Sequence, residues 1–379
     1  MSSFVPSFAV TRIAEKSQRR SGLPGPGIVS LALGEPDFDT PAPVLEAGIA
    51  ALRSGHTHYI DSSGDPELRE ALADTVSKTA GESFGADQIF VTHGAAAGIT
   101  STILGVCNPG DRIVIPSPSY PLYSEAAYMA GAAPIFVPTK PDFHLDLDRL
   151  DGALRGSRML VICNPCNPTG AVLTREELDR IAELAQKHGV IVLADEAYCE
   201  IVYDGREFVS MLSLPELRPR LILCQTFSKT FAMTGWRVGY LAGPIDIIKA
   251  IGFINRTFVG GPNAAVNRAA LEATRIGAKL AEPMREEYAK RRTLVMEHEK
   301  NIEALEARPP EGTFYLFARY KLEIPSRDLV ARLLQARVAV RAGSEYGPSG
   351  EGHIRLSFAT SEANIIEGLA RMRNVLNAS

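Results

Sequence analysis

Lys229 stands in a stretch of the chain that has no other charged residue. Residues 221–236 read LILCQTFSKTFAMTGW, and Lys229 is their only Asp, Glu, Lys or Arg. Removal from water disfavours an ammonium group, so a lysine held among Phe227, Phe231 and Met233 should have a lowered pKa and tend toward the neutral amine. A neutral amine attacks carbonyl carbons, which is the chemistry of Schiff-base catalysis. The alternative is a lysine that reaches solvent from the end of a strand.

Side chains that bind phosphate lie close to Lys229 in the sequence. Thr226 and Ser228 carry hydroxyls, and Arg237, eight residues on, carries a guanidinium. The segment SKTFAMTGWRVGY (228–240) resembles the cofactor-lysine signature of class I aminotransferases, enzymes of fold type I that use pyridoxal 5′-phosphate (PLP). Other motifs of this family follow along most of the chain. The resemblance implies that Lys229 holds PLP and that Thr226, Ser228 and Arg237 bind its phosphate.

Composition limits the partners and the compartment. The 379 residues carry a net charge of -4, which gives no electrostatic reason to expect nucleic acid as a partner. The N-terminal sequence MSSFVPSFAVTRIAEKSQRR lacks the basic start and apolar run of a signal peptide. Five cysteines, an odd number, suit reduced thiols, and the Cys163-x-x-Cys166 pair has no second pair with which to bind a metal. We expect a cytoplasmic protein without a resident metal.

One segment resembles a membrane span in hydropathy alone. Residues 91–110 contain no Asp, Glu, Lys or Arg and are long enough to cross a bilayer. Thr92, His93, Asn108, Pro109 and several glycines interrupt this stretch. It therefore predicts a turn and a buried amphipathic helix, and no membrane segment.

Residues from about 60 to 250 alternate short β-branched runs with amphipathic helical patterns. This alternation is typical of an α/β fold with a mostly parallel sheet flanked by helices. The predicted strands are 88–92, 112–116, 159–163, 190–195, 221–226 and 237–243. Asp65-Pro66 should begin one helix, and Thr174 with Glu177 forms a capping box that should begin another.

The C-terminal part reads as α+β. Residues 314–320 and 353–359 predict strands, with a helix at 326–335 between them, and a long helical pattern from 263 to 305 is interrupted at Pro283. The family resemblance implies a large domain with a seven-stranded sheet and a smaller α+β domain. We expect residues 1–45 to join the small domain, 46–285 to form the large PLP-binding domain and 286–379 to form the small domain.

Polar residues that follow strands are the candidates for a site, because ligands of parallel sheets bind at the carboxyl ends of the strands. Asp195 closes an apolar run, where a buried carboxylate needs a charged partner. In the family the matching aspartate pairs with the protonated pyridine nitrogen of PLP, and residues matching Tyr198 and Asn167 donate to its phenolic oxygen. An aspartate that caps a helix from a loop is the alternative for Asp195.

The start of a predicted helix offers further phosphate contacts. Gly94, Ala95 and Ala96 follow the strand 88–92, and backbone N–H groups at a helix start bind anions. Many relatives carry a hydroxyl or amide where this chain has alanines, so backbone donors should matter more here. By resemblance, Tyr120 stacks on the pyridine ring, although packing in the core is a fair alternative for this side chain.

Substrate recognition requires a cation for the α-carboxylate. Arg355 stands alone among apolar residues in HIRLSFA (353–359), and a guanidinium can bind a carboxylate through two parallel hydrogen bonds. The resemblance assigns it this role, with Asn167 and the backbone near Gly34 as further substrate contacts. An arginine on the solvent face of an edge strand is the alternative.

Tyr59 matches a family tyrosine that reaches the phosphate of the neighbouring subunit. The resemblance therefore implies a homodimer that shares its sites, with Tyr59 contributed across the interface. For side-chain specificity, Arg256, Tyr123 and the segment around Ile13 are candidates.

We expect an aminotransferase that moves the amino group of an L-amino acid to a 2-oxo acid, commonly 2-oxoglutarate, by a ping-pong mechanism. Lys229, Asp195 and Tyr198 are the predicted catalytic residues. A PLP-dependent C–S β-lyase on the same fold is the nearest alternative, since the motifs are shared. A PLP-binding regulatory domain is a remote one, because the residues ahead of LALGEPDFDTP leave no room for a DNA-binding module.

Overall fold

The computed structural model describes residues 5–16 and 25–377. Its largest sheet has seven strands in the order β2-β8-β7-β6-β5-β3-β4, and only β8 runs antiparallel to its neighbours. The bounds are β2 Ile89–Thr92, β3 Arg112–Ser117, β4 Ala133–Pro138, β5 Met159–Cys163, β6 Ile191–Asp195, β7 Leu221–Thr226 and β8 Gly239–Ala242. The predicted α/β fold with a mostly parallel seven-stranded sheet is confirmed.

Two details of this sheet differ from the strands read in the sequence. The sequence does not predict strand β4, because Pro134 and Pro138 are unusual within strands. Strand β4 lies at the edge of the sheet, where a proline removes few hydrogen bonds between strands. Strand β8 begins at Gly239 and not at Arg237, because Arg237 has φ +54°, a left-handed conformation that does not continue a strand.

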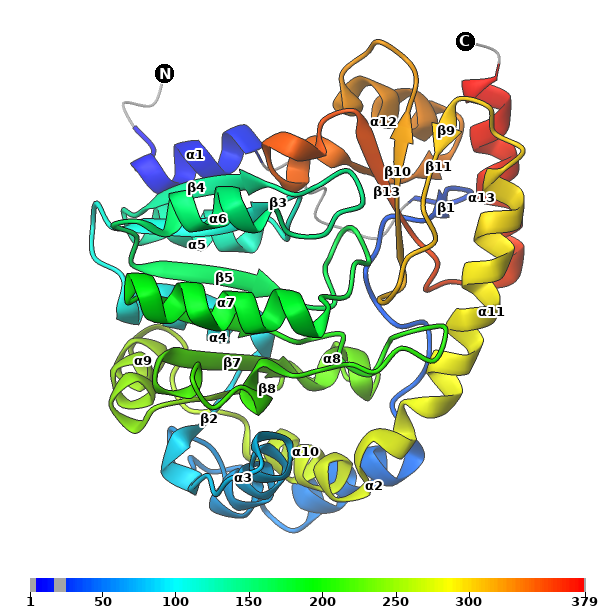
Figure 1. Ribbon diagram of the computed structural model, residues 1–379. Helices are drawn as coiled ribbons and strands as arrows, with labels where there is room; N and C mark the ends of the chain where they lie inside the picture. Colours follow the sequence, from blue (N-terminus) through cyan, green and yellow to red (C-terminus); the bar gives the residue numbers. More distant parts are fainter. Residues whose placement is uncertain (1–4, 17–24, 378–379) are drawn as a thin grey trace.

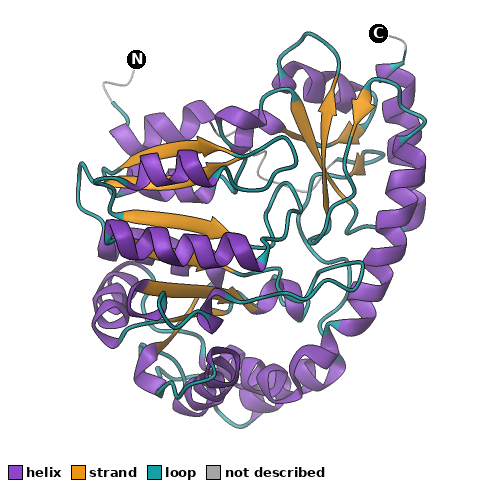
Figure 2. Cartoon of the chain, in the orientation of Figure 1, coloured by secondary structure: helices purple, strands orange, loops and turns teal. Residues whose placement is uncertain are grey.

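Helices cover both faces of the large sheet (Figures 1 and 2). One face packs against α3 (Pro66–Ala80), α6 (Leu147–Leu154), α7 (Arg175–His188) and α10 (Ala264–Ile276), and α2 (Ala42–Arg53) lies against α10. The other face packs against α4 (Gly94–Val106), α5 (Leu122–Met129) and α9 (Ile245–Phe258). A short helix, α8 (Phe227–Thr230), follows β7. Residues 91–110 thus supply the end of β2 and the mostly buried helix α4, and no helix in the described ranges has the length and apolarity needed to cross a membrane.

The predicted helix starts are present. Asp65 caps α3, since its carboxylate accepts hydrogen bonds from the backbone N–H groups of Glu67 and Leu68. Thr174 and Glu177 form the capping box of α7. The long helical pattern breaks earlier than expected: α10 ends at Ile276, and Pro283 lies in the first turn of α11 (Glu282–Glu299), where its missing N–H costs nothing.

A second sheet of four strands has the order β12-β13-β10-β9. Its members are β9 Leu305–Glu306, β10 Tyr315–Tyr320, β12 Arg341–Ala342 and β13 His353–Ser357, and α11, α12 (Ser326–Gln335) and α13 (Glu362–Leu376) accompany it. Figure 1 shows α11 in yellow along one side of the molecule, from the region of α2 to α13. The short 3₁₀ helices are η1 Ala86–Gln88, η2 Met211–Ser213, η3 Arg218–Arg220, η4 Gly277–Leu280, η5 Gly343–Tyr346 and η6 Pro348–Gly350.

The N-terminal segment contacts both parts of the fold through elements that flank the two sheets. Strand β1 (Val29–Ser30) pairs in parallel with β11 (Val338–Ala339) beside the four-stranded sheet. Helix α1 (Phe8–Lys16) lies instead on α5, with the Phe8 ring centroid 6.4 Å from that of Tyr128. The division at residues 45 and 285 stays a prediction.

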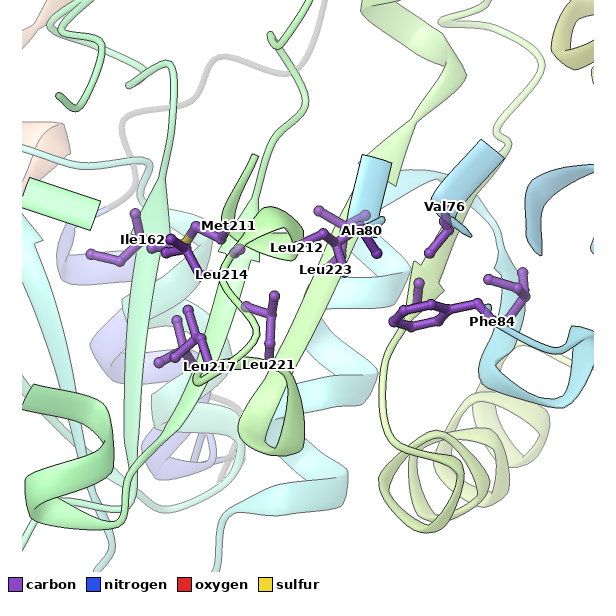
Figure 3. Packing of buried hydrophobic residues seen from close by; sticks show 14 of the residues in the cluster. Val76, Ala80, Phe84, Ile162, Met211, Leu212, Leu214, Leu217, Leu221 and Leu223 are labelled. Atoms are coloured by element: carbon purple, nitrogen blue, oxygen red, sulfur yellow. The ribbon is translucent and has the colours of Figure 1, made fainter. Parts of the chain in front are cut away.

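Large aliphatic side chains of the large sheet's core pack together near Val76 and Ala80 of α3 (Figure 3). Leu217 and Leu214 are almost fully buried there, next to Leu221 of β7. Burial of this kind fixes the sheet whose strand ends carry the polar residues described below.

Leu217→Ala should lower the free energy of unfolding by about 2–5 kcal/mol, because it removes buried methyl groups and leaves a cavity. Urea unfolding followed by circular dichroism measures this change. Ile366→Ala on the exposed face of α13, where the side chain is 41% exposed, is the control and should change stability by less than about 0.5–1 kcal/mol. Equal losses in the two variants would contradict the core placement of Leu217.

Candidate active site

A cavity of about 530 Å³ lies where the carboxyl ends of the large sheet face the four-stranded sheet. Its lining draws on both sheets, on α4 and α8, and on residues 32–35 of the N-terminal segment. Thirteen of the residues singled out in the sequence line it: Gly34, Ala95, Ala96, Tyr120, Tyr123, Asn167, Asp195, Tyr198, Thr226, Ser228, Lys229, Arg237 and Arg355. Residues separated by more than 300 positions in the chain therefore share one site.

Lys229 projects into this cavity from α8. Thr226 caps the helix, since its hydroxyl oxygen accepts a hydrogen bond from the backbone N–H of Ser228. The amine of Lys229 donates to the carbonyl oxygen of Gly34 at 2.6 Å and lies 5.9 Å from the centroid of the Phe314 ring. Burial lowers the pKa of Lys229 to about 8; the carboxylate of Glu35 opposes this shift, and two nearby guanidiniums add to it. A larger share of the amine is thus neutral near pH 8 than in an ordinary lysine.

The cause of this desolvation differs from the one expected. Phe227 and Met233 belong to the core of the large sheet, and Phe231 packs against that core. They anchor α8 to that core. The contacts of the amine itself are with the carbonyl of Gly34 and the ring of Phe314, which are distant in sequence and could not be read from the local pattern.

Asp195 is buried at the end of β6, as its apolar run predicted. The hydroxyl of Tyr123 donates to its Oδ2 at 2.7 Å, and the backbone N–H of Ala197 donates to its Oδ1 at 3.2 Å. Burial raises the pKa of Asp195, and the hydrogen bond from Tyr123 partly opposes the rise. A cationic ring nitrogen beside this carboxylate would favour its charged form.

Tyr123 had been considered only for side-chain specificity. It is fully buried, lines the cavity and holds Asp195 by a hydrogen bond. The available signal was its place three residues after Tyr120, which puts a second phenol on the same segment. Tyr120 itself lines the cavity, and its ring meets that of Tyr123 edge to face at 5.7 Å.

Gly94 permits a close approach between Arg237 and the start of α4. A Cβ on Gly94 would lie 2.7 Å from Arg237 Nη2, and the glycine has φ +74°. Gly94 is not itself among the lining residues, but Ala95 and Ala96 are, and no side chain caps this helix start. Gly239 packs closely against the same helix start, since a Cβ on it would lie 3.0 Å from the carbonyl carbon of Gly94. Backbone, hydroxyl and guanidinium donors are thus gathered at one end of the cavity.

Arg355 occupies the other end, in an interior strand of the small sheet. It is 5% exposed, so the solvent-facing alternative is excluded. Its Nη1 donates to Asn167 Oδ1 at 3.1 Å and its Nη2 to the carbonyl oxygen of Ala32 at 2.6 Å. Its Nε is buried and has no partner among the described protein groups.

Tyr315 was missed in the sequence. The guanidinium carbon of Arg355 lies 4.1 Å from the centroid of its ring, and the hydroxyls of Tyr315 and Tyr198 are 2.9 Å apart. Gly34 is required here, because a Cβ on it would lie 1.9 Å from the Tyr315 hydroxyl oxygen. A tyrosine at the start of an apolar strand gave no distinctive signal.

Three site residues suggested by the sequence, Tyr59, Arg256 and Ile13, do not line the cavity of their own chain. Tyr59 is 98% exposed. Arg256 is exposed near the end of α9, where its guanidinium stacks 4.7 Å from the centroid of the Phe253 ring. Ile13 in α1 is likewise not one of the lining residues. The structure therefore gives Arg256 and Ile13 no place beside Lys229 within a single chain.

The donor set fits PLP. An amine with a lowered pKa can hold an aldehyde, a buried carboxylate can pair with a pyridine nitrogen, and the helix start with Arg237 can bind a phosphate. A carboxylate ligand can be held by the guanidinium of Arg355, which lines the cavity. These groups surround one volume, so they could act on a single bound molecule.

Comparisons with known proteins agree with this arrangement. The family model for aminotransferase class I and II matches residues 26–372. The bifunctional aspartate aminotransferase and glutamate/aspartate-prephenate aminotransferase of Petunia hybrida is 38% identical over 94% of this chain and 78% of its own length. The aromatic-amino-acid aminotransferase 2 of Thermococcus litoralis is 38% identical over 92% of both chains. The crystal structure of an aromatic aminotransferase from Pyrococcus horikoshii superposes with a TM-score of 0.90 at 36% identity, covering 98% of this chain and 99% of that one.

The lowered pKa of Lys229 predicts how fast the protein free of cofactor combines with PLP. Only the neutral amine attacks the aldehyde, so the rate should rise with pH around a midpoint near 8. Stopped-flow absorbance of PLP measures the rate, with Nα-acetyl-lysine as the unburied control. A midpoint for the protein near the ordinary lysine value of 10.5 would contradict the desolvation of this amine.

Proposed function

This chain belongs to the class I and II aminotransferases, which are PLP-dependent, and we propose that it transfers amino groups at the cavity around Lys229. It moves the amino group of an L-amino acid to a 2-oxo acid by a ping-pong mechanism. One observation supports this cavity as the active site: the amine of Lys229, with its lowered pKa, the buried carboxylate of Asp195 and the buried guanidinium of Arg355 all line it. The relatives named above are all aminotransferases, and no observation favours a C–S lyase.

Each end of the cavity would hold one part of the bound cofactor. Backbone N–H groups of Gly94, Ala95 and Ala96, with Thr226, Ser228 and Arg237, would bind the phosphate. Asp195 would pair with the pyridine nitrogen, Asn167 and Tyr198 would donate to the phenolic oxygen, and Tyr120 would lie against the ring. PLP, when bound, supplies an electron sink for the carbon that carries the amino group.

Lys229 would move the proton in the reaction. Because its pKa is lowered to about 8, the amine can accept a proton near neutral pH and return it without a large energetic penalty. Tyr123 supports the step indirectly, since its hydroxyl holds Asp195 in place. Phe314 and the segment at Gly34 would exclude water from the amine of Lys229 and so keep its pKa low.

Arg355 would bind the α-carboxylate of both substrates. Its guanidinium is already held by Asn167 and by the ring of Tyr315, so little side-chain entropy is lost when a carboxylate binds. The names of the relatives point to acidic and aromatic amino acids as donors, and we propose the same two classes for this chain. Mixing the PLP form with each amino acid, and recording the loss of the cofactor absorption band, would rank them.

We also propose a homodimer in which Tyr59 completes the partner's phosphate site. An aromatic side chain that is 98% exposed on one chain gains stability when a second copy covers it. Phe253 and Phe258 of α9 are also large exposed apolar groups that a partner could cover. The cytoplasmic location stays a prediction.

Lys229→Ala should lower kcat for transamination by about 10⁴-fold or more, because the general acid–base group is lost. The variant should still retain PLP, since its phosphate and ring contacts come from other residues. Steady-state kinetics and the PLP absorption spectrum measure the two effects. Lys249→Ala, at an exposed lysine of α9, is the control and should match the parent protein. Substantial turnover by Lys229→Ala would refute the assignment.

Hybrid dimers test the role of Tyr59. Refolding Lys229→Ala together with Tyr59→Ala gives mixed dimers in which one of the two sites carries neither substitution. If the site is shared, activity should rise above that of either variant, toward about a quarter of the parent activity for random pairing. No gain, with dimers present by sedimentation, would contradict a contribution of Tyr59 across the interface.

A further inference from the structure

Three ionisable side chains from separate segments meet outside the cavity. His144 Nδ1 lies 2.9 Å from Glu177 Oε2, and His144 Nε2 lies 3.5 Å from Glu311 Oε2. His144 follows β4, Glu177 lies in α7, and Glu311 precedes β10 of the small sheet. One imidazole ring thus bridges two carboxylates that belong to different parts of the fold.

Glu177 is fixed to the large sheet. Its Oε2 accepts a hydrogen bond from the backbone N–H of Thr174 at 2.9 Å, as part of the capping box, and its Oε1 accepts one from Leu145 at 2.8 Å. The side chain is only 8% exposed. It gives His144 a rigid anchor.

Glu311 holds the turn that carries Asn167. The backbone N–H groups of Glu311 and Gly312 both donate to the carbonyl oxygen of Gly170, at 3.0 and 2.8 Å. Glu311 Oε2 also accepts a hydrogen bond from the backbone N–H of Val172 at 2.9 Å. These three bonds tie the segment at Glu311 to Gly170 and Val172, which follow Asn167 by three and five residues.

The same segment leads directly to Tyr315. Thr313 donates its backbone N–H to the carbonyl oxygen of Ile201 at 2.9 Å, and its Oγ1 accepts the N–H of Tyr315 at 3.2 Å. Asn167 and Tyr315 contact Arg355 through a hydrogen bond and a ring face, respectively. Two of the groups that hold the guanidinium, Asn167 and Tyr315, therefore depend on the placement of Glu311, whereas the carbonyl oxygen of Ala32 belongs to another segment.

The charge on His144 keeps the two carboxylates together. Its hydrogen bonds to Glu177 and Glu311 raise the pKa of His144 to about 10 against the effect of burial, so the ring is protonated at neutral pH. Arg206 Nη2, 2.8 Å from Glu311 Oε1, is the other cation that contacts this group. A neutral side chain at position 144 would leave two poorly solvated carboxylates facing each other.

We propose that His144 is a positioning residue for transamination: its imidazolium holds Glu311, and thereby sets Asn167 and Tyr315 on the substrate-binding guanidinium of Arg355. The proposal rests on the assignment of Arg355 as the carboxylate site. His144 itself does not line the cavity and would not touch substrate. Its effect should therefore appear mainly in the binding of both substrates. A smaller effect on the binding of PLP should follow, because Asn167 would also donate to the cofactor.

The test compares His144→Gln with the double variant His144→Gln/Glu311→Gln. The single variant leaves the two carboxylates unbridged, so KM for the amino acid and for 2-oxoglutarate should each rise about tenfold while kcat changes less than about threefold. The double variant removes one of the repelling charges and should recover most of this loss, to within about threefold of the parent KM. The dissociation constant of PLP should change by less than about threefold in both, since the residues that would bind its phosphate are untouched.

His188→Gln is the matched control. His188 also pairs with a carboxylate, Asp151 at 2.5 Å, but lies at the far end of α7 and should leave KM unaltered. Unchanged KM in His144→Gln, or a double variant with KM higher than the single one, would overturn the proposal. A melting temperature that falls in His144→Gln with no change in KM would assign His144 a purely structural role and overturn it as well.

Arg355→Lys separates this proposal from the function on which it rests. If Arg355→Lys leaves KM unchanged, the assignment of the carboxylate site fails whatever the His144 variants do. If Arg355→Lys raises KM for both substrates and His144→Gln does not, only the positioning role fails.

Discussion

Desolvation of charged groups around one cavity is the constraint on which the rest of this structure depends. Asp195 and Arg355 are buried and Lys229 is half-buried. Each is held by a different partner: a backbone carbonyl for the amine, the Tyr123 hydroxyl for the carboxylate, and Asn167 with the Tyr315 ring for the guanidinium. Burial of this kind is costly unless the group is paired or changes its pKa. Here it lowers the pKa of the amine and raises that of the carboxylate, which suits proton transfer and cofactor binding.

The large sheet supplies the reactive end of the site and the small sheet supplies the substrate end. Carboxyl ends of β6 and β7 present Asp195 and the helix of Lys229, whereas β13 presents Arg355. Close backbone contacts connect the two: Gly34 passes against Tyr315, and Glu311 binds the turn at Gly170. Figure 1 shows how the small sheet and α11 stand beside the strand ends of the large sheet. The precision of the site thus depends on contacts between segments that are distant in sequence.

The sequence predicted the parts of this site that are encoded locally. Lys229 and Arg355 each stand as a lone charge among apolar residues, and Asp195 closes an apolar run. The capping residues Asp65 and Thr174 mark their helices directly. What it did not predict depends on packing between distant segments. Tyr123 and Tyr315 look like ordinary core aromatics until the chain folds, and the apolar neighbours of Lys229 turn away into the core. Strand β4 was hidden by its prolines, and the left-handed conformation of Arg237 shortens β8.

The central claim is that the amine of Lys229 forms an imine with PLP in this cavity. Reduction of the holoprotein with borohydride, followed by proteolysis and mass spectrometry, tests it most directly. The account predicts that the peptide containing Lys229 carries the mass of a reduced pyridoxyl phosphate group and that other lysine peptides do not. A protein that stays colourless in excess PLP, with no mass increment on that peptide, would contradict it.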